Sequence, residues 1–373
     1  YSKRIEILAA LLLSGLVFKE YFDNFNIAIK ELEKLVKNYF DSDGFPLTRN
    51  PSDLVFFSKY LILCKECIKD AQQYVPDFLD TIINKNLKCI KNISTPNNET
   101  PLFNGGKEES LTKFDKFFDD LNLKTKNKKN IIGGIHAYNF KDNAIFFDVG
   151  EPPRKDFSRS YQSGPLSFEY YIDGKKIITN CGFGSNISSK AELLSRLTSA
   201  QSTLTLEDTS VTKFERNKLI NRVFGNSIKN TFKVNNLDFI EDKDLVKFIA
   251  SHNGYEKEFS CIHKREISVN KVNGELIGKD EIIKKKNGRP INYSFRFHLY
   301  PGLTAVKTMG GNSVLVQISK NKSLIFTIID ESILLEKSIF LGRNKILDNT
   351  CITISGNLVN KDKTIRWEIK KNI

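Results

Sequence analysis

The spacing of the apolar residues changes once along this chain, and that change restricts the possible folds more than any other feature. In the first 93 residues, apolar side chains recur at intervals of three and four; one such series is Ile27, Ile29, Leu32, Leu35, Val36 and Tyr39. This interval places side chains on one face of an α-helix. From about residue 131 the interval becomes two, which is typical of β-strands. We therefore predict helices followed by β-structure.

The helical part carries recognisable start and stop signals. Asn50-Pro51 suits the start of a helix, with Asn50 as the N-cap and Pro51 at the first helical position. Residues 54–68 supply the apolar body of that helix. Residues 41–44 interrupt the preceding helix, and Pro76 begins a further one.

The apolar run at residues 5–18 has two interpretations, a secretion signal or a buried helix. It follows two basic residues, as a signal does, but no small-residue cleavage site comes after it. It is also too short to span a bilayer comfortably. We predict a buried helix and no transmembrane segment. A chain that opens within a helix also indicates that residues upstream of Tyr1 are missing.

The β-part is predicted to be antiparallel. Residues 168–172, Asp173-Gly174 and residues 175–179 are typical of a strand, a tight turn and a strand. Further strands are predicted at residues 202–206, 258–269, 293–300, 314–319 and 324–329, with turns at Asn273-Gly274 and Asn287-Gly288. No long amphipathic helix separates these strands, so the pattern favours two antiparallel sheets packed as a sandwich.

Residues 94–130 are polar and irregular, apart from a short helix expected around residues 111–121. The predicted organisation is therefore a multidomain α+β protein. It has a helical domain over residues 1–93, a linker over 94–130 and a large antiparallel β-sandwich over 131–373.

The net charge of +13 could attract nucleic acid, an anionic membrane or a polyuronate. The lysines are spread along the whole chain, however, and no dense basic arm or nucleic-acid-binding motif accompanies them. A solvated basic surface explains most of them, and we expect no nucleic-acid partner. The six cysteines include one CxxC pair, Cys64 and Cys67, without the second pair that a structural zinc site needs. Buried free thiols are the favoured interpretation.

Several sequence blocks resemble the heparinase II/III-like polysaccharide lyases. The clearest are residues 164–169 (GPLSFE), Asn180-Cys181-Gly182 and residues 196–204 (RLTSAQSTL). Supporting matches are Gly44, Arg49-Asn50-Pro51, Phe103-Asn104-Gly105, His252-Asn253-Gly254-Tyr255, His263-Lys264-Arg265, residues 296–301 and residues 335–338. They follow the family's order and cover nearly the whole chain.

The resemblance implies the last helices of an (α/α) toroid followed by the β-sandwich. Four helices cannot close a toroid, which again implies upstream sequence. The resemblance also implies β-elimination of an acidic, uronate-containing polysaccharide, and a periplasmic or extracellular location if family behaviour holds. That reaction needs a group that neutralises the uronate carboxylate, a base for the C5 proton and an acid for the leaving oxygen. The oligomeric state is not predicted.

The chain departs from the family at the expected zinc site. The His, Asp and His ligands of zinc-containing relatives correspond to Gln162, Asn180 and Gln201, and a further catalytic His corresponds to Ser160. Neutral amides are poor zinc ligands but can form a hydrogen-bonded cluster. We therefore expect no zinc and no other cofactor, with the three amides close together.

The resemblance nominates candidate site residues, and each has a structural alternative. The catalytic candidates are Asn50, Arg49, Tyr255, His252 and Tyr161; the substrate-binding candidates are Arg159, Arg196, Gln162 and Gln201. Asn50 could be only a helix cap, Arg49 part of an ion pair and His252 an exposed turn residue. Both tyrosines could be packed aromatics, and Arg196 a brace of the sandwich. His263 and His298 are predicted to be structural.

Two functions compete. The first is a lyase of acidic polysaccharide that works without zinc, which the retained residues 49–51 and 252–255 favour. The second is a non-catalytic carbohydrate-binding or structural relative, which the three amides favour. A nucleic-acid binder is a distant third.

Overall fold

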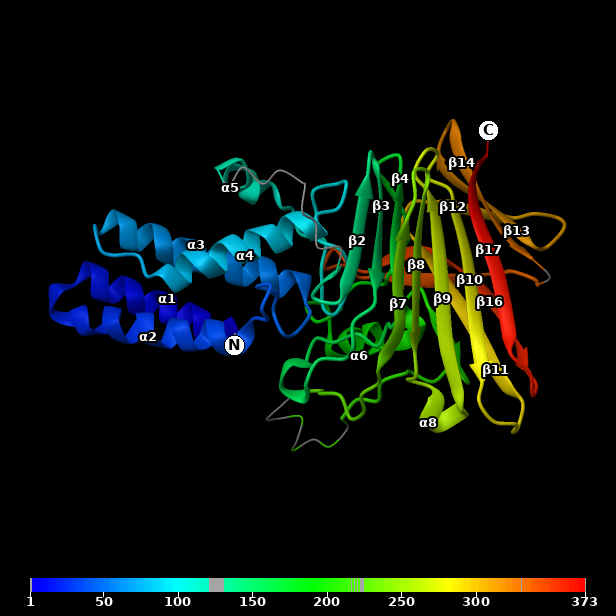
Figure 1. The fold of residues 1–373 in the computed structure, drawn as a ribbon, viewed down its shortest axis with the longest axis horizontal. Coiled ribbons are helices and arrows are strands. Elements are labelled where there is room, and N and C mark those ends of the chain that lie inside the picture. Colours follow the sequence, from blue (N-terminus) through cyan, green and yellow to red (C-terminus); the bar gives the residue numbers. More distant parts are fainter. Residues whose placement is uncertain are drawn as a thin grey trace.

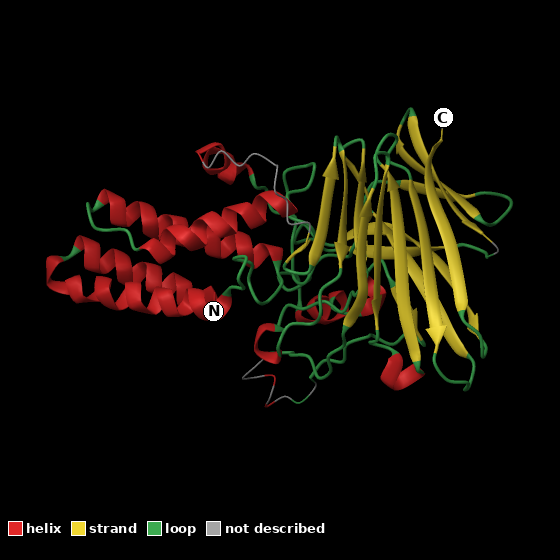
Figure 2. Ribbon diagram, in the orientation of Figure 1, coloured by secondary structure: helices red, strands yellow, loops and turns green. Residues whose placement is uncertain are grey.

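The computed structural model describes residues 2–120, 131–215, 217, 219, 221, 225–329 and 331–372. Long helices lie at one end of the molecule and two large antiparallel sheets at the other (Figures 1 and 2). The predicted order of helices followed by antiparallel β-structure is confirmed. Residues 121–130 of the expected linker lie outside the described residues.

The helical part contains α1 (Ser2–Val17), α2 (Phe22–Tyr39), α3 (Pro51–Asp70) and α4 (Asp77–Ile93), with a short 3₁₀ turn at Lys19–Tyr21. Helix α1 packs against α2 and α3, and α3 packs against α4. The predicted α2 face is wrong at Ile27, which is 51% exposed. The face instead runs through Phe25, Ala28, Leu32, Leu35 and Tyr39, a strict three-and-four spacing that Ile27 does not fit.

The helix predicted at residues 5–18 is present, but it ends at Val17 and only one of its faces is buried. Ile5, Leu8, Ala9 and Leu12 point into the core, whereas Ile7 and Val17 are exposed. None of the described helices is both long and apolar enough to cross a bilayer.

Helix α3 starts as the sequence predicts. The Asn50 side chain accepts a hydrogen bond from the backbone N–H of Ser52 at 2.9 Å, and Pro51 is the first helical residue. An N-cap satisfies one of the free N–H groups at a helix start, which typically contributes about 1 kcal/mol.

The segment between the helices and the sheets is irregular but well packed. It contains a 3₁₀ turn (Thr112–Phe114) and the short helix α5 (Asp115–Asp120). Leu102, Phe103 and Asn104 are almost completely buried. This stretch therefore forms part of the contact between the helices and the sheets.

The first sheet contains β1–β6, β11, β15 and β16, in the order β1-β2-β3-β4-β5-β11-β16-β15, with β6 also pairing with β11. Its strands are β1 (Ile131–Ile132), β2 (Ile135–Phe140), β3 (Asn143–Asp148), β4 (Phe168–Ile172), β5 (Lys175–Thr179), β6 (Leu204–Leu206), β11 (Ile291–Leu299), β15 (Leu334–Phe340) and β16 (Leu347–Leu358).

The second sheet has the order β12-β13-β14-β17-β10-β9-β8-β7. Its strands are β7 (Val234–Glu241), β8 (Leu245–His252), β9 (Cys261–Asn270), β10 (Leu276–Lys284), β12 (Thr304–Lys307), β13 (Ser313–Ser319), β14 (Lys322–Ile329) and β17 (Lys363–Asn372). Short helices α6 (Ser189–Ser195) and α8 (Glu256–Phe259) lie in the loops.

The predicted hairpin at Asp173-Gly174 is confirmed, because Ile172 pairs with Lys175 across it. Both turn residues have positive φ, 49° and 71°, as the tight hairpin turn requires. The predicted strand at 258–269 is partly wrong: residues up to Phe259 belong to α8, and β9 starts only at Cys261. Of residues 202–206, only Leu204–Leu206 pair as a strand.

The core lies between the two sheets. Along β9 every second side chain is buried, which is the pattern of a strand with one inward face. Trp367 stacks on Phe168 and Phe326 across this core, at centroid distances of 5.6 and 6.0 Å. The predicted sandwich is therefore present. All six cysteines are free thiols, as predicted, although Cys67 is only half-buried.

Candidate functional site: a cleft between the helices and the sandwich

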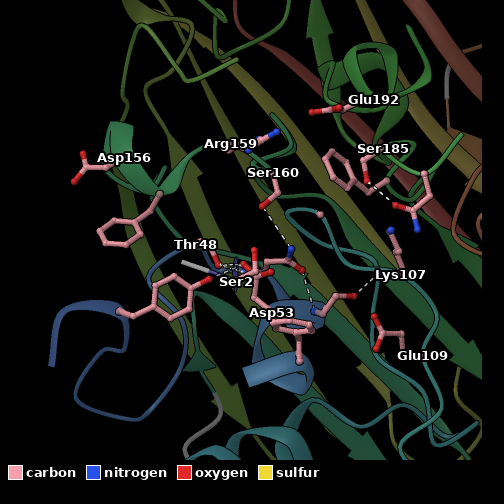
Figure 3. A pocket seen from close by; sticks show the side chains of 18 residues that line it. Ser2, Thr48, Asp53, Lys107, Glu109, Asp156, Arg159, Ser160, Ser185 and Glu192 are labelled. Carbon is pink, nitrogen blue, oxygen red and sulfur yellow. Dashed lines mark hydrogen bonds between the residues drawn. The ribbon is translucent and has the colours of Figure 1, made fainter. Parts of the chain in front are cut away.

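A cleft of about 690 Å³ opens where the ends of the helices meet loops of the sandwich (Figure 3). Its lining comes from the end of α2, the start of α3, the segment around Gly105 and the loops before β4 and around α6. The lining residues are Ser2, Tyr39, Thr48, Asn50, Ser52, Asp53, Phe56, Gly105, Lys107, Glu109, Asp156, Phe157, Arg159, Ser160, Phe183, Ser185, Asn186 and Glu192.

A tight connection brings α2 and α3 together at this cleft. The Leu47 backbone N–H donates to the Tyr39 carbonyl at 2.8 Å. The Asp41 carboxylate accepts from the backbone N–H groups of Asp43 and Phe45, which closes the turn. Tyr39 at the end of α2 therefore lies close to the first turn of α3.

Arg49 links the segment between α2 and α3 to the sandwich. Its guanidinium forms an ion pair with Asp148 and donates to the carbonyls of Gly133, Gly134, Gly150 and Glu151. Arg49 is 8% exposed and does not line the cleft. Of the two sequence interpretations, the structure shows the ion pair, so the residue positions the cleft wall rather than facing its interior.

Asn50 is both a helix cap and a cleft residue. Its oxygen caps α3, whereas its Nδ2 atom lies 3.5 Å from the hydroxyl of Ser160 across the cleft floor. This approach depends on Gly105: a Cβ there would lie 2.7 Å from Asn50 Nδ2 and 2.6 Å from Ser160 Cβ. The Gly105 φ of +99° also excludes most other residues.

A tyrosine–carboxylate pair lies on the same wall, and the sequence analysis missed it. The Tyr39 hydroxyl donates to Asp53 Oδ2 at 2.9 Å, and the Thr48 hydroxyl donates to the same atom at 2.7 Å. Burial raises the pKa of Asp53, against the two hydrogen bonds that lower it. In the sequence, Tyr39 resembles any residue of an apolar helix face, and Asp53 resembles any acidic residue in the first turn of a helix. No sequence signal distinguishes them.

Two cations line the cleft. Arg159 is exposed, as suits its predicted substrate-binding role, and Lys107 is half-buried. Within the described part of the chain, neither forms an ion pair. Burial lowers the pKa of Lys107. Both side chains are therefore available to an anionic ligand.

Tyr255 and His252 lie in the sandwich core and do not line the cleft. The Tyr255 hydroxyl contacts the carbonyl oxygens of Leu204 and Thr209, at 3.0 and 3.2 Å. His252 is 1% exposed, so its interpretation as an exposed turn residue is wrong. Its Nδ1 accepts from the Gly254 N–H, and burial holds its pKa well below the ordinary value. Both residues can stabilise the fold, but neither can reach a ligand in the cleft.

Tyr161 and Arg196 are also buried, just behind the cleft. Arg196 donates to the carbonyls of Ser158, Tyr161 and Asn226, and its guanidinium lies 4.1 Å from the ring centroid of Phe214. The structure therefore shows Arg196 as a brace, with backbone carbonyls as its partners. The Tyr161 ring is fully buried, and desolvation raises the pKa of its hydroxyl.

The three amides at the expected zinc position are almost fully buried, and the two glutamines share a hydrogen-bond acceptor. Gln162 and Gln201 donate to the Ser195 carbonyl, at 2.7 and 2.8 Å. Asn180 Oδ1 accepts from the N–H of Ser202, and Gln162 Oε1 accepts from the N–H of Gly105. Two of the amide oxygens thus face N–H donors, and the nitrogens face carbonyls. This donor set does not fit Zn²⁺, which needs several convergent anionic or imidazole ligands.

The nine candidates therefore divide into three groups. Asn50 and Arg159 line the cleft. Gln162 and Gln201 support it from behind, and Arg49 anchors its wall. The other four, Tyr161, Arg196, Tyr255 and His252, are buried in the sandwich part.

Comparisons with known proteins agree on the fold. The heparinase II/III-like C-terminal family matches residues 132–368. The heparan sulfate lyase HepC from Pedobacter heparinus superposes with a TM-score of 0.76 at 15% identity, covering 99% of this chain and 59% of the lyase. A heparinase III structure gives a TM-score of 0.76 at 14% identity, covering 98% of this chain and 60% of that one. No curated protein matches the chain.

The chain thus spans about three fifths of the length of these lyase structures. At such low identity the structural likeness shows a shared fold alone. The family match is a separate observation, and it covers well over half of the chain. This chain therefore belongs to the heparinase II/III-like family.

Proposed function

We propose that this protein binds an acidic, uronate-containing polysaccharide in the cleft and cleaves it by β-elimination. The observation that carries the proposal is the joint lining of one cleft by the Asn50 amide, the Arg159 guanidinium and the Lys107 ammonium group. These are the donors that a carboxylate requires, because charge-assisted hydrogen bonds to carboxylates are short and strong. The similar structures, a heparan sulfate lyase and a heparinase, point to the same substrate class.

In this proposal Asn50 Nδ2 donates to the uronate carboxylate while its oxygen keeps capping α3. Arg159 or Lys107 supplies the positive charge that stabilises the negative charge developing on the carboxylate as the C5 proton leaves. Arg49 binds no substrate; it holds the wall through Asp148. Gln162 fixes the Gly105 backbone, which allows Asn50 and Ser160 to approach each other.

A second candidate function is polysaccharide binding without cleavage. It is favoured by Ser160, which lines the cleft at the position where the family resemblance places a catalytic His. It is also favoured by the burial of all four histidines, none of which is among the described cleft residues.

The experiment compares binding and cleavage with purified protein. Binding of unsulfated and sulfated uronate polymers is measured by calorimetry, and cleavage by the ultraviolet absorbance of the unsaturated uronyl end. Arg159→Gln should weaken binding about tenfold to a hundredfold, the value of one charge-assisted hydrogen bond. Arg154→Gln is the matched control, because Arg154 is an exposed arginine outside the lining of this cleft.

The lyase proposal is supported if the parent protein both binds and cleaves a polymer and if Arg159→Gln weakens both. Binding without cleavage supports the second candidate. Absence of binding to every polymer, or equal binding by the two variants, contradicts the assignment of this cleft.

A further inference from the structure

Elimination needs a group that exchanges protons, and the described part of the cleft lining offers few. It contains no histidine or cysteine, and its single tyrosine is Tyr39. Glu109 and Asp156 lie near the cations Lys59 and Arg154, at 3.8 and 3.7 Å. The Tyr39 hydroxyl, by contrast, is held 2.9 Å from a carboxylate that lines the same cleft.

We propose that Tyr39 and Asp53 form the proton-transfer pair of this cleft, in place of the histidine that Ser160 replaces. This inference rests on the proposed function, since it assigns the acid and base of that reaction. It adds two residues that the family resemblance does not nominate.

The geometry of the pair suits a relay. Tyr39 and Thr48 both donate to Oδ2 of Asp53, so the carboxylate is fixed in one orientation. The Tyr39 hydroxyl already donates to Oδ2, so this is the atom that receives the phenol proton. The Tyr39 ring is 2% exposed and stacks on Phe57 at 4.2 Å, which fixes the direction of its hydroxyl. A positioned acid or base of this kind typically contributes about 10²–10⁴ in rate.

The electrostatics of Asp53 support the same role. Burial raises its pKa, and the charge of Glu109 acts in the same direction. A carboxylate with a raised pKa is a better proton acceptor than an ordinary aspartate. It can therefore take the phenol proton at the moment when Tyr39 receives another.

The proposed step conserves atoms and charge. The Tyr39 oxygen takes the C5 proton of the uronate while its own proton moves to Asp53. The electron pair of the C5–H bond forms the C4–C5 double bond, and the bond between C4 and the glycosidic oxygen breaks. Tyr39 then gives a proton to the departing oxygen and regains one from Asp53. The pair ends as it began, and no oxidant or cofactor is consumed.

The experiment uses two variants that keep the packing. Tyr39→Phe retains the ring stacked on Phe57 and removes only the hydroxyl. Asp53→Asn retains an oxygen that can accept from Thr48 but cannot exchange a proton. Tyr74→Phe is the matched control, because the Tyr74 hydroxyl bonds Asp77 on the exposed surface away from the cleft.

Both cleft variants should lower kcat by about 10²–10⁴ while polymer affinity stays within about twofold of the parent. Asp53→Asn should also remove the acidic limb of the pH–rate profile, which a purely structural role would not do. Tyr74→Phe should be unchanged in every measurement.

The outcomes separate this inference from the proposed function. Cleavage that survives Tyr39→Phe contradicts the relay and leaves the lyase proposal standing. Binding without cleavage by the parent protein also contradicts the relay, and it supports the non-catalytic alternative. Failure of the parent protein to bind any acidic polymer contradicts both proposals at once.

Discussion

The side-chain amides of Gln162 and Gln201 donate to one backbone oxygen, that of Ser195, at 2.7 and 2.8 Å. The shared acceptor joins the loop before β4, the end of α6 and the segment before β6. Gln162 also donates to Gly182 and accepts from Gly105, so the cluster extends to the cleft. Hydrogen bonds thus connect loops that the family resemblance would connect through a metal ion.

The first prediction concerns metal. We expect that no zinc is needed for folding, because the amide atoms of the cluster are engaged by backbone groups. A chelator should leave the melting temperature unchanged, and metal analysis should find less than stoichiometric zinc. A structural zinc site would respond strongly to the chelator, since its binding free energy is folding free energy. One tightly bound zinc per chain at this cluster would contradict the prediction.

The second prediction concerns Gln162. Gln162→Met keeps the volume but leaves the Gly105 N–H without its acceptor. It also removes one donor each from the carbonyls of Gly182 and Ser195, and Gln201 still bonds the second of these. We expect a loss of about 1–3 kcal/mol in the free energy of unfolding, the cost of one orphaned buried group. Gln73→Met, at an exposed position, should change the stability by less than about 0.5 kcal/mol. Urea denaturation measures both values. Equal stabilities of the two variants would show that the cluster is dispensable.

The third prediction concerns pH. All four histidines are buried, and burial lowers the pKa of each; those of His136 and His298 fall to about 4. A histidine whose folded pKa lies below its unfolded value binds more protons when unfolded. Stability should therefore be complete above the unfolded value of about 6.5 and should fall as the pH drops from there toward about 4.

Thermal unfolding between pH 7.5 and 4.5 checks this dependence. His136 is suited to a variant, because it packs between Phe239 and Phe248 and its ring nitrogens have no hydrogen-bond partner among the described residues. His136→Phe should flatten the pH dependence. An unchanged slope in this variant would show that His136 is already charged in the folded protein.

The fourth prediction separates Tyr255 from catalysis. Its hydroxyl contacts the carbonyl oxygens of Leu204 and Thr209, and Tyr255 is not among the residues that line the cleft. Tyr255→Phe should cost about 1–2 kcal/mol of stability and leave polymer binding and cleavage unchanged at a temperature where the variant is folded. A large loss of activity without a loss of stability would restore Tyr255 as a catalytic candidate.

The order of helices and strands was predictable because it follows from the spacing of apolar residues and from local start and turn signals. The helix start at Asn50-Pro51 and the hairpin at Asp173-Gly174 depend only on neighbouring residues, and both are confirmed. Whether a side chain is buried or exposed depends instead on the whole fold. His252 lies beside an Asn-Gly pair, which suggested exposure, yet the second sheet packs it against His263.

The cleft itself was only partly predictable for the same reason. Tyr39 completes the apolar series of α2, and Asp53 is the ordinary acidic residue of a first helical turn. The two side chains meet only because the chain turns back between α2 and α3, where the Leu47 N–H bonds the Tyr39 carbonyl. Periodicity carries no information about this turn, so neither residue could be selected from the sequence.

The central claim, elimination in this cleft with Asn50 at the carboxylate, is tested most directly by the cleavage rate of Asn50→Ser. Serine is as good an N-cap as asparagine, so α3 and the melting temperature should be preserved. It has no amide to donate to the uronate, and the initial rate of unsaturated uronyl formation should fall by about 10²–10³ relative to the parent protein, as for the loss of one preorganised donor. An Asn50→Ser protein that cleaves the polymer at the parent rate would contradict the account.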